Sequence, residues 1–140
     1  MKNNQLTISV LPFLAALLLS ASNASACECP APESPARAFN QSDVVFSGKM
    51  IGMRPSKTSR EKIQYRFQVG NVWKGPEKNG NLFIENFNQS KCSFTFDKDA
   101  KYLVYADKSE GVFSATICSR TRELSTAGED LEFLILKLGK

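Results

Sequence analysis

The sequence contains no histidine. This absence removes the commonest general base, the commonest protein ligand for metals and every catalytic triad that depends on an imidazole. The sequence also lacks a phosphate-binding glycine loop, a nucleophile elbow and a C-x-x-C redox motif. We therefore predict that the protein is not an enzyme and has no cofactor of its own.

Two pairs of carboxylates remain as candidates for acid–base chemistry, Asp97 with Asp99 and Glu129 with Asp130. Spacing alone does not separate such a pair from solvated turn charges. For Glu129 and Asp130, interaction with the dipole at a helix start is a sufficient explanation. Neither pair is predicted to be catalytic.

Long apolar runs are absent except at the N-terminus, where Leu6–Leu19 is mostly apolar and follows the charged Lys2. The run is shorter than the roughly 20 residues of a membrane-spanning helix. It precedes Ala24-Ser25-Ala26, the small-x-small pattern that a signal peptidase accepts. We predict a signal peptide over residues 1–26 and a secreted, extracellular or periplasmic mature domain over residues 27–140, with no transmembrane segment.

The net charge of +4 is modest, and no block of one sign is present. Basic residues gather only loosely, at Arg54, Lys57, Arg60, Lys62 and Arg66. No motif for stacking bases accompanies them, so nucleic acid is not predicted as a partner. The simpler interpretation of these basic residues is a solvated loop and strand face. The functional interpretation is a weak affinity for acidic polysaccharide or lipid surfaces.

Only four cysteines are present, all of them in the predicted mature domain. Four cysteines allow three pairings, and a bridge between Cys27 and Cys29 would close a very tight ring, so two interlocked pairings remain. A four-cysteine zinc site usually has paired C-x-x-C knuckles, whereas Cys92 and Cys118 are far apart. Because export leads to an oxidising compartment, we predict two disulfides.

The middle of the chain has strand character. Apolar residues alternate with polar ones between Ile63 and Val69, which is the two-residue period of a half-buried strand. Turn formers separate the predicted strands, which are Val44–Met53, Ile63–Trp73, Leu82–Phe87, Tyr102–Ala106 and Val112–Cys118. We expect Phe67, Val104 and Ile117 in the core.

A helix is predicted at each end of this region. Ser34 and Pro35 fit the N-cap and first position of a short helix. Thr126 and Glu129 have the spacing of a capping box. The apolar face that follows consists of Leu131, Leu134, Ile135 and Leu138, ahead of a stop at Gly139. The predicted fold class is all-β: a five-stranded Greek-key barrel of the OB type with a short N-terminal helix, a C-terminal helix and two disulfides.

The predicted mature N-terminus carries metal-binding chemistry. Cleavage before Cys27 would leave an α-amine that titrates near pH 8, so a fraction is uncharged at neutral pH. Together with the Cys27 carbonyl, this nitrogen forms a five-membered bidentate chelate. The zinc of a protease keeps one position open for water or substrate, and a rigid amine–carbonyl pair fits that position.

Short motifs along the predicted mature domain also occur together, in order, in a known family. They are the C-x-C start at Cys27, Ala38-Phe39, Ser42–Val45, Ile63–Tyr65, Trp73–Lys78, Ser90–Cys92, Tyr102–Val104, Ile117-Cys118 and Leu124–Thr126. In this order they resemble the amino-terminal, netrin-like domain of the tissue inhibitors of metalloproteinases.

The resemblance implies a secreted protein inhibitor of zinc metalloproteases, which we expect to be a monomer. It implies the disulfides Cys27–Cys92 and Cys29–Cys118. The implied protease-binding wedge consists of Cys27, Glu28, Cys29 and Pro30, flanked by Ser90 and Lys91. The amine and carbonyl of Cys27 would bind the zinc of the target protease, which is the partner.

The sequence departs from the family pattern in ways that bear on the target. Asn40 occupies the position where the family has a cysteine, so one of the family's disulfides is missing. The family's carboxy-terminal domain is not found. Glu28 stands where the animal inhibitors carry a small Ser or Thr that enters the S1′ pocket, and Lys91 replaces a small or apolar residue. Because an unpaired carboxylate in an apolar pocket is costly, Glu28 favours a target with a basic S1′ pocket.

Two other functions use the same features. A netrin-like extracellular binding module with no protease target would share the barrel, since fold does not fix function. Such a module has no reason to begin at a chelating cysteine. An envelope lipoprotein lipidated at Cys27 would lose both the thiol and the amine, but Ala24 replaces the usual lipobox Leu and a polar stretch precedes the cysteine. We favour the inhibitor.

Overall fold

The structure is a computed structural model, and it describes residues 27–30, 34–76 and 80–139. The predicted signal peptide lies outside the described residues. The elements in chain order are α1 (Pro35–Gln41), β1 (Val44–Pro55), β2 (Lys62–Lys74), β3 (Asn81–Phe87), β4 (Lys101–Ser109), β5 (Val112–Ser114), β6 (Arg122–Glu123), the 3-10 helix η1 (Leu124–Thr126) and α2 (Gly128–Leu138).

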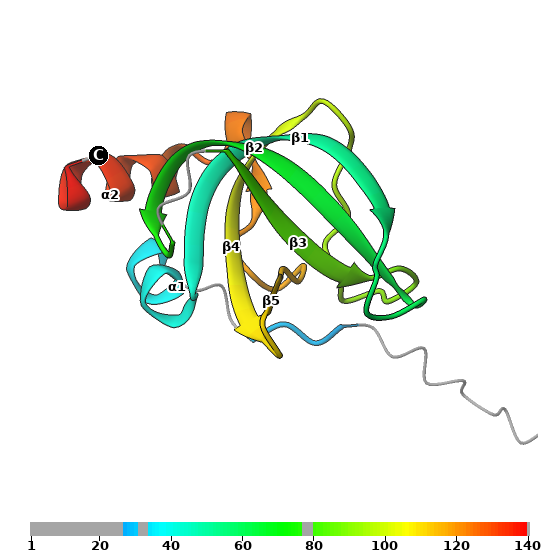
Figure 1. Cartoon of the computed structure of the whole chain (residues 1–140). Coiled ribbons are helices and arrows are strands. Elements are labelled where there is room, and N and C mark those ends of the chain that lie inside the picture. Colours follow the sequence, from blue (N-terminus) through cyan, green and yellow to red (C-terminus); the bar gives the residue numbers. More distant parts are fainter. Residues whose placement is uncertain (1–26, 31–33, 77–79, 140) are drawn as a thin grey trace, which may run out of the picture.

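Five strands close into a barrel in the order β1-β2-β3-β5-β4, and β1 pairs again with β4 (Figure 1). Strand β1 curves to reach both neighbours, and its register with β2 shifts at three points. At Gly48 a β-carbon would lie only 2.9 Å from the backbone oxygen of Gln68, so a side chain there would push β1 and β2 apart. The predicted OB-type barrel with a helix at each end is confirmed.

Aromatic rings make up a large part of the core inside the barrel. Phe67 is fully buried and meets Phe46, Phe96 and Tyr102 edge to face, with ring centroids 4.9 to 6.3 Å apart. Edge-to-face pairs of this kind add to the stabilisation from burial. Val104 is also fully buried. The predicted core positions of Phe67 and Val104 are therefore confirmed.

The predicted core position of Ile117 is wrong, because 48% of its surface is exposed. Strand β5 ends at Ser114 instead of continuing to Cys118. The chain turns at Thr116, whose carbonyl accepts a hydrogen bond from the Ser119 amide at 3.1 Å. A turn interrupts the alternation of inward and outward side chains, so Ile117 reaches solvent.

Helices α1 and α2 cover the outer face of β1 and β4 through a second apolar cluster. Its buried members are Ala38, Val45, Trp73, Leu103, Tyr105, Ala127 and Leu134. Helix α1 begins as predicted: Ser34 is the N-cap, its Oγ accepts a hydrogen bond from the Arg37 amide, and Pro35 follows it.

Helix α2 packs through a different face from the predicted one. Leu134 is fully buried and Leu131 partly buried, but Ile135 and Leu138 are 52% and 37% exposed. The buried residue on this helix that the apolar pattern missed is Asp130. Burial of the Asp130 carboxylate against the barrel turns Ile135 toward solvent, and Leu138 is the last residue of the helix.

The predicted capping box is also wrong, although the helix itself is present. The N-cap of α2 is Ala127, which has no side-chain capping bond. Thr126 Oγ1 instead donates to the Glu123 carbonyl at 2.9 Å, within the η1 turn. The preceding 3-10 turn thus uses the hydroxyl that a capping box would need.

Candidate functional site

Two disulfides fasten the N-terminal segment to the end of the barrel. Cys27 is bonded to Cys92 with their α-carbons 5.2 Å apart, and Cys29 to Cys118 with theirs 5.0 Å apart. This is the pairing that the resemblance implies, and it leaves no free cysteine. The sulfurs of Cys27 and Cys118 lie 3.7 Å apart, so the two bridges are in contact. The segment is therefore held at two points within three residues.

Backbone hydrogen bonds hold the two partner cysteines side by side. The Cys92 carbonyl accepts from the Ile117 amide at 2.9 Å, next to an isolated bridge between Ser93 and Thr116. The Phe94 amide donates to the Ala115 carbonyl at 3.1 Å. The chain from Cys92 to Phe94 is thus paired with the chain just before Cys118, independently of the two disulfides.

A buried amide, Asn86, supports this pairing. Its Nδ2 donates to the Phe94 carbonyl at 2.6 Å, and its Oδ1 accepts from the Ala115 amide at 3.0 Å. Sequence reasoning missed this residue. The available signal was that Asn86 continues the inward positions of Leu82 and Ile84, where a polar side chain requires partners.

The residues predicted to bind the protease form one surface, which we call the N-terminal ridge: Cys27, Glu28, Cys29, Pro30, Ser90 and Lys91. The Cys27–Cys92 bridge brings Ser90 and Lys91 to the segment that begins at Cys27. All six are exposed except Cys27, which is partly buried. Ser90 shapes its own turn, because its Oγ accepts from the Cys92 amide at 3.2 Å.

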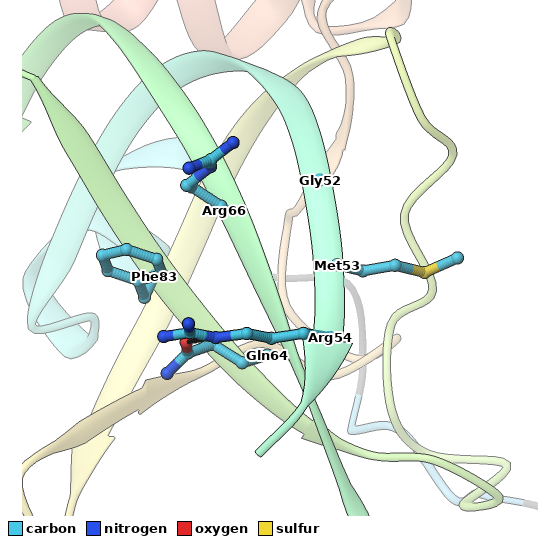
Figure 2. A pocket seen from close by; sticks show the side chains of 6 residues that line it. All are labelled: Gly52, Met53, Arg54, Gln64, Arg66 and Phe83. Atoms are coloured by element: carbon cyan, nitrogen blue, oxygen red, sulfur yellow. Dashed lines mark hydrogen bonds between the residues drawn. The ribbon is translucent and has the colours of Figure 1, made fainter. Parts of the chain in front are cut away.

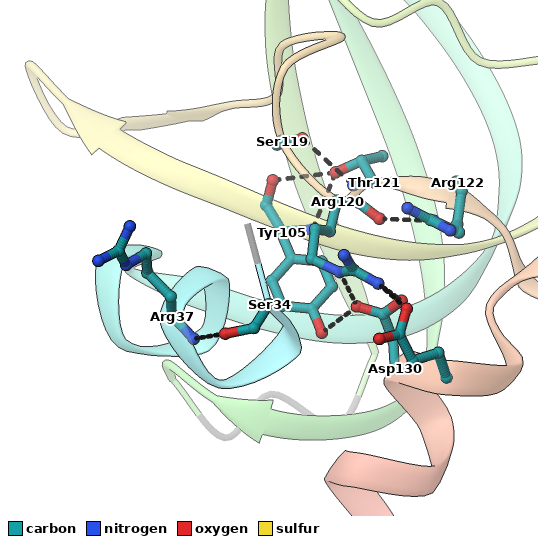
Figure 3. Close-up of polar contacts among 9 residues, drawn as sticks. Ser34, Arg37, Tyr105, Ser119, Arg120, Thr121, Arg122 and Asp130 are labelled. Atoms are coloured by element: carbon teal, nitrogen blue, oxygen red, sulfur yellow. Dashed lines mark hydrogen bonds and ion pairs between the residues drawn. The ribbon is translucent and has the colours of Figure 1, made fainter. Parts of the chain in front are cut away.

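A buried polar network connects the chain just after Cys118, at Arg120, with Tyr105 and Asp130 (Figure 3). Arg120 donates from Nε and Nη2 to the two oxygens of Asp130, at 2.6 and 2.8 Å, and from Nη2 to Glu129 at 2.8 Å. The Tyr105 hydroxyl donates to Asp130 at 2.9 Å. These bonds connect the turn to α2 and to β4.

The network changes the acid–base properties of its members. Hydrogen bonding to Asp130 raises the pKa of Arg120 further above its usual value. Burial, together with the neighbouring Asp130 carboxylate, raises the pKa of Tyr105. Asp130 thus has a structural partner, and the helix dipole is not a sufficient explanation for it. Asp99, by contrast, is an exposed turn residue with an ion pair to Lys49.

A disulfide-stapled OB-type barrel with an exposed cysteine-rich N-terminal segment is the class that this geometry defines. The family model described as tissue inhibitor of metalloproteinase matches residues 25–128, which include all four cysteines, α1 and every strand. The chain belongs to this family. No curated protein matches it. In the part of the chain that the structure describes, no helix is long and apolar enough to cross a membrane.

Proposed function

We propose that this protein inhibits a zinc metalloprotease by presenting Cys27 to the catalytic zinc. Membership of the inhibitor family supports an inhibitory role. The observation that carries the proposal is the double attachment of the N-terminal ridge, whose Glu28 lies between two bridged cysteines and remains exposed. Ordering this segment before binding lowers the entropy lost when the complex forms.

The chemistry of the proposal depends on a mature chain that begins at Cys27. The free α-amine and the carbonyl of that residue would occupy the open position of the protease's zinc and displace its water. The zinc belongs to the protease. The Cys27–Cys92 bridge keeps the chelating residue in place while the enzyme approaches.

Glu28 and Lys91 are proposed to select the target. Glu28 would enter the S1′ pocket, where a carboxylate without a partner costs binding free energy. A basic S1′ pocket would pair with it. Lys91, on the neighbouring turn, adds positive charge at the rim and favours an acidic surface beside the cleft.

Two measurements test the proposal. Mass spectrometry of the exported protein should give the mass of a chain beginning at Cys27 with both disulfides intact; a lipidated mass would favour the envelope lipoprotein. The purified mature protein should then inhibit at least one zinc metalloprotease in a panel that includes enzymes with basic and apolar S1′ pockets. Failure against the whole panel would favour a netrin-like binding module.

A further inference from the structure

A second surface feature lies on the outer face of β1, β2 and β3, and it shares no residue with the N-terminal ridge. It is a hollow of about 260 Å³ (Figure 2). The residues that line it are Gly52, Met53, Arg54, Gln64, Arg66 and Phe83. Two guanidinium groups, a carboxamide and a phenyl ring thus meet on one face of the barrel.

Strand register explains why these side chains gather there. Arg66 stands opposite Gly52 on β1 and opposite Phe83 on β3, while Gln64 stands opposite Arg54. Tyr65 and Phe67 of β2 point into the core, so the alternate residues of the strand face outward. A β-carbon at residue 52 would lie 3.8 Å from Nη2 of Arg66, an ordinary contact distance, so the Arg66 side chain lies next to Gly52 on β1.

Arg54 is held in position before any ligand arrives. Its Nε donates to Gln64 Oε1 at 2.9 Å, and its guanidinium carbon lies 6.0 Å from the centre of the Phe83 ring. Gln64 is fixed in turn, because its Nε2 donates to Glu85 Oε1 at 2.9 Å. Glu85 also accepts from Thr58 and is 4% exposed, so its carboxylate is occupied within the protein.

Among the described residues, neither arginine at the hollow forms an ion pair. Within residues 27–30, 34–76 and 80–139, ion pairs join Lys49 to Asp99 and Arg120 to Glu129 and Asp130, and none involves Arg54 or Arg66. Guanidinium groups bind carboxylate, sulfate and phosphate through paired N–H donors. The Phe83 ring, 38% exposed, offers an apolar wall beside them.

We propose that this hollow binds an acidic saccharide, with its carboxylate or sulfate at Arg54 and Arg66 and its ring carbons against Phe83. The strand 2–3 face of OB barrels is a known platform for oligosaccharides and oligonucleotides. A lipid bilayer fits less well, because Met53 extends away from Phe83, so the two apolar side chains do not form one patch (Figure 2). The proposal does not depend on protease inhibition.

Binding is tested with three disaccharides that differ only in their acidic group: one with a uronate, one with a sulfate and one with neither. Amide chemical shifts of residues 52–54, 64–66 and 83 should move with the acidic sugars only. Arg54→Gln and Arg66→Gln should each raise the dissociation constant about tenfold. This is the loss of affinity expected when one charge-assisted hydrogen bond is removed. The matched control is Lys108→Gln, since Lys108 also lies over a ring, that of Phe113, outside the hollow.

Each other outcome contradicts the proposal. Equal shifts with the neutral disaccharide would show that the anionic group does not contribute to binding. Inorganic sulfate that binds as tightly as the sulfated sugar would show that Phe83 does not contribute. An equal loss of affinity in Lys108→Gln would show that net charge alone, and not the position of the arginines, controls binding. Binding to phosphatidylglycerol vesicles without binding to either acidic sugar would assign the surface to lipid.

Discussion

Arg120 and Asp130 form a two-point ion pair in which the carboxylate is completely buried and the arginine side chain only 10% exposed. The pair joins the turn after Cys118 to the first helical turn of α2. Because Cys118 holds Cys29, the same contact supports the base of the N-terminal ridge. One buried ion pair thus helps to hold the N-terminal ridge, which lies on the surface.

Removing one partner of this pair should destabilise the protein strongly. Asp130→Ala leaves the Arg120 guanidinium without its main counter-charge, and we expect a loss of about 3 to 5 kcal/mol in the free energy of unfolding. Urea denaturation measures it. The control is Glu129→Gln, whose carboxylate is 71% exposed, with an expected loss below about 1 kcal/mol. Similar losses in the two variants would contradict the assigned importance of Asp130.

The pKa shifts of the tyrosines predict a loss of stability in alkali. Burial is the main cause that raises the pKa of Tyr65, Tyr102 and Tyr105 above the usual value of 10.0. The folded state therefore favours the neutral phenols. Their contribution to stability is complete below about pH 10 and is lost as the pH rises through the folded-state pKa values.

Near-ultraviolet absorbance of phenolate measures this difference directly. These three residues are all the tyrosines of the sequence, so the native signal should rise at higher pH than the signal in concentrated urea. Tyr105→Phe should reduce the decline of the unfolding free energy above about pH 10. Coincident titration curves for native and unfolded protein would contradict the shifts.

Phe67 and Ile117 were both predicted to lie in the core, and the structure separates them. Phe67→Ala should cost about 3 to 5 kcal/mol, because the fully buried ring leaves a cavity among other aromatic rings. Ile117→Ala should cost about 0.5 kcal/mol, since its side chain is half exposed. Thermal and urea denaturation of the two variants compare them. Equal losses of unfolding free energy in the two variants would indicate that Ile117 is buried, against the structure.

Local signals predicted the elements of this fold where one physical effect controlled them. The alternation around Phe67 marked β2, and Ser34 with Pro35 marked the start of α1. The end of β5 was missed because it depends on a turn at Thr116 and a bridge at Cys118 to a residue 89 positions away. Contacts between such distant parts leave no periodic pattern in the sequence.

The same distinction applies to the candidate site. The resemblance to the family predicted the disulfide pairing that holds the N-terminal ridge. Asn86 and Asp130 were not predicted as its supports, since each acts through partners that only the folded chain brings near. The signals available in the sequence were a polar residue at an inward strand position, Asn86, and an acid at a helix start, Asp130.

Glu28 should determine which proteases are inhibited. Glu28→Thr removes a carboxylate that an apolar S1′ pocket would leave unpaired, so inhibition of enzymes with such pockets should improve at least tenfold, corresponding to about 1.4 kcal/mol. Inhibition of an enzyme with a basic S1′ pocket should weaken. Inhibition constants for the two enzyme classes check the prediction. A change of the same sign for both classes would mean that Glu28 lies outside S1′.

The most direct test of the zinc-binding mechanism adds one alanine before Cys27 of the mature chain. The addition converts the α-amine of Cys27 into an amide and leaves every side chain of the barrel and both disulfides in place. The extended protein should unfold at the same urea concentration as the native protein but should lose inhibition of the same zinc metalloprotease. Equal inhibition by the native and extended proteins would contradict chelation of the zinc by Cys27.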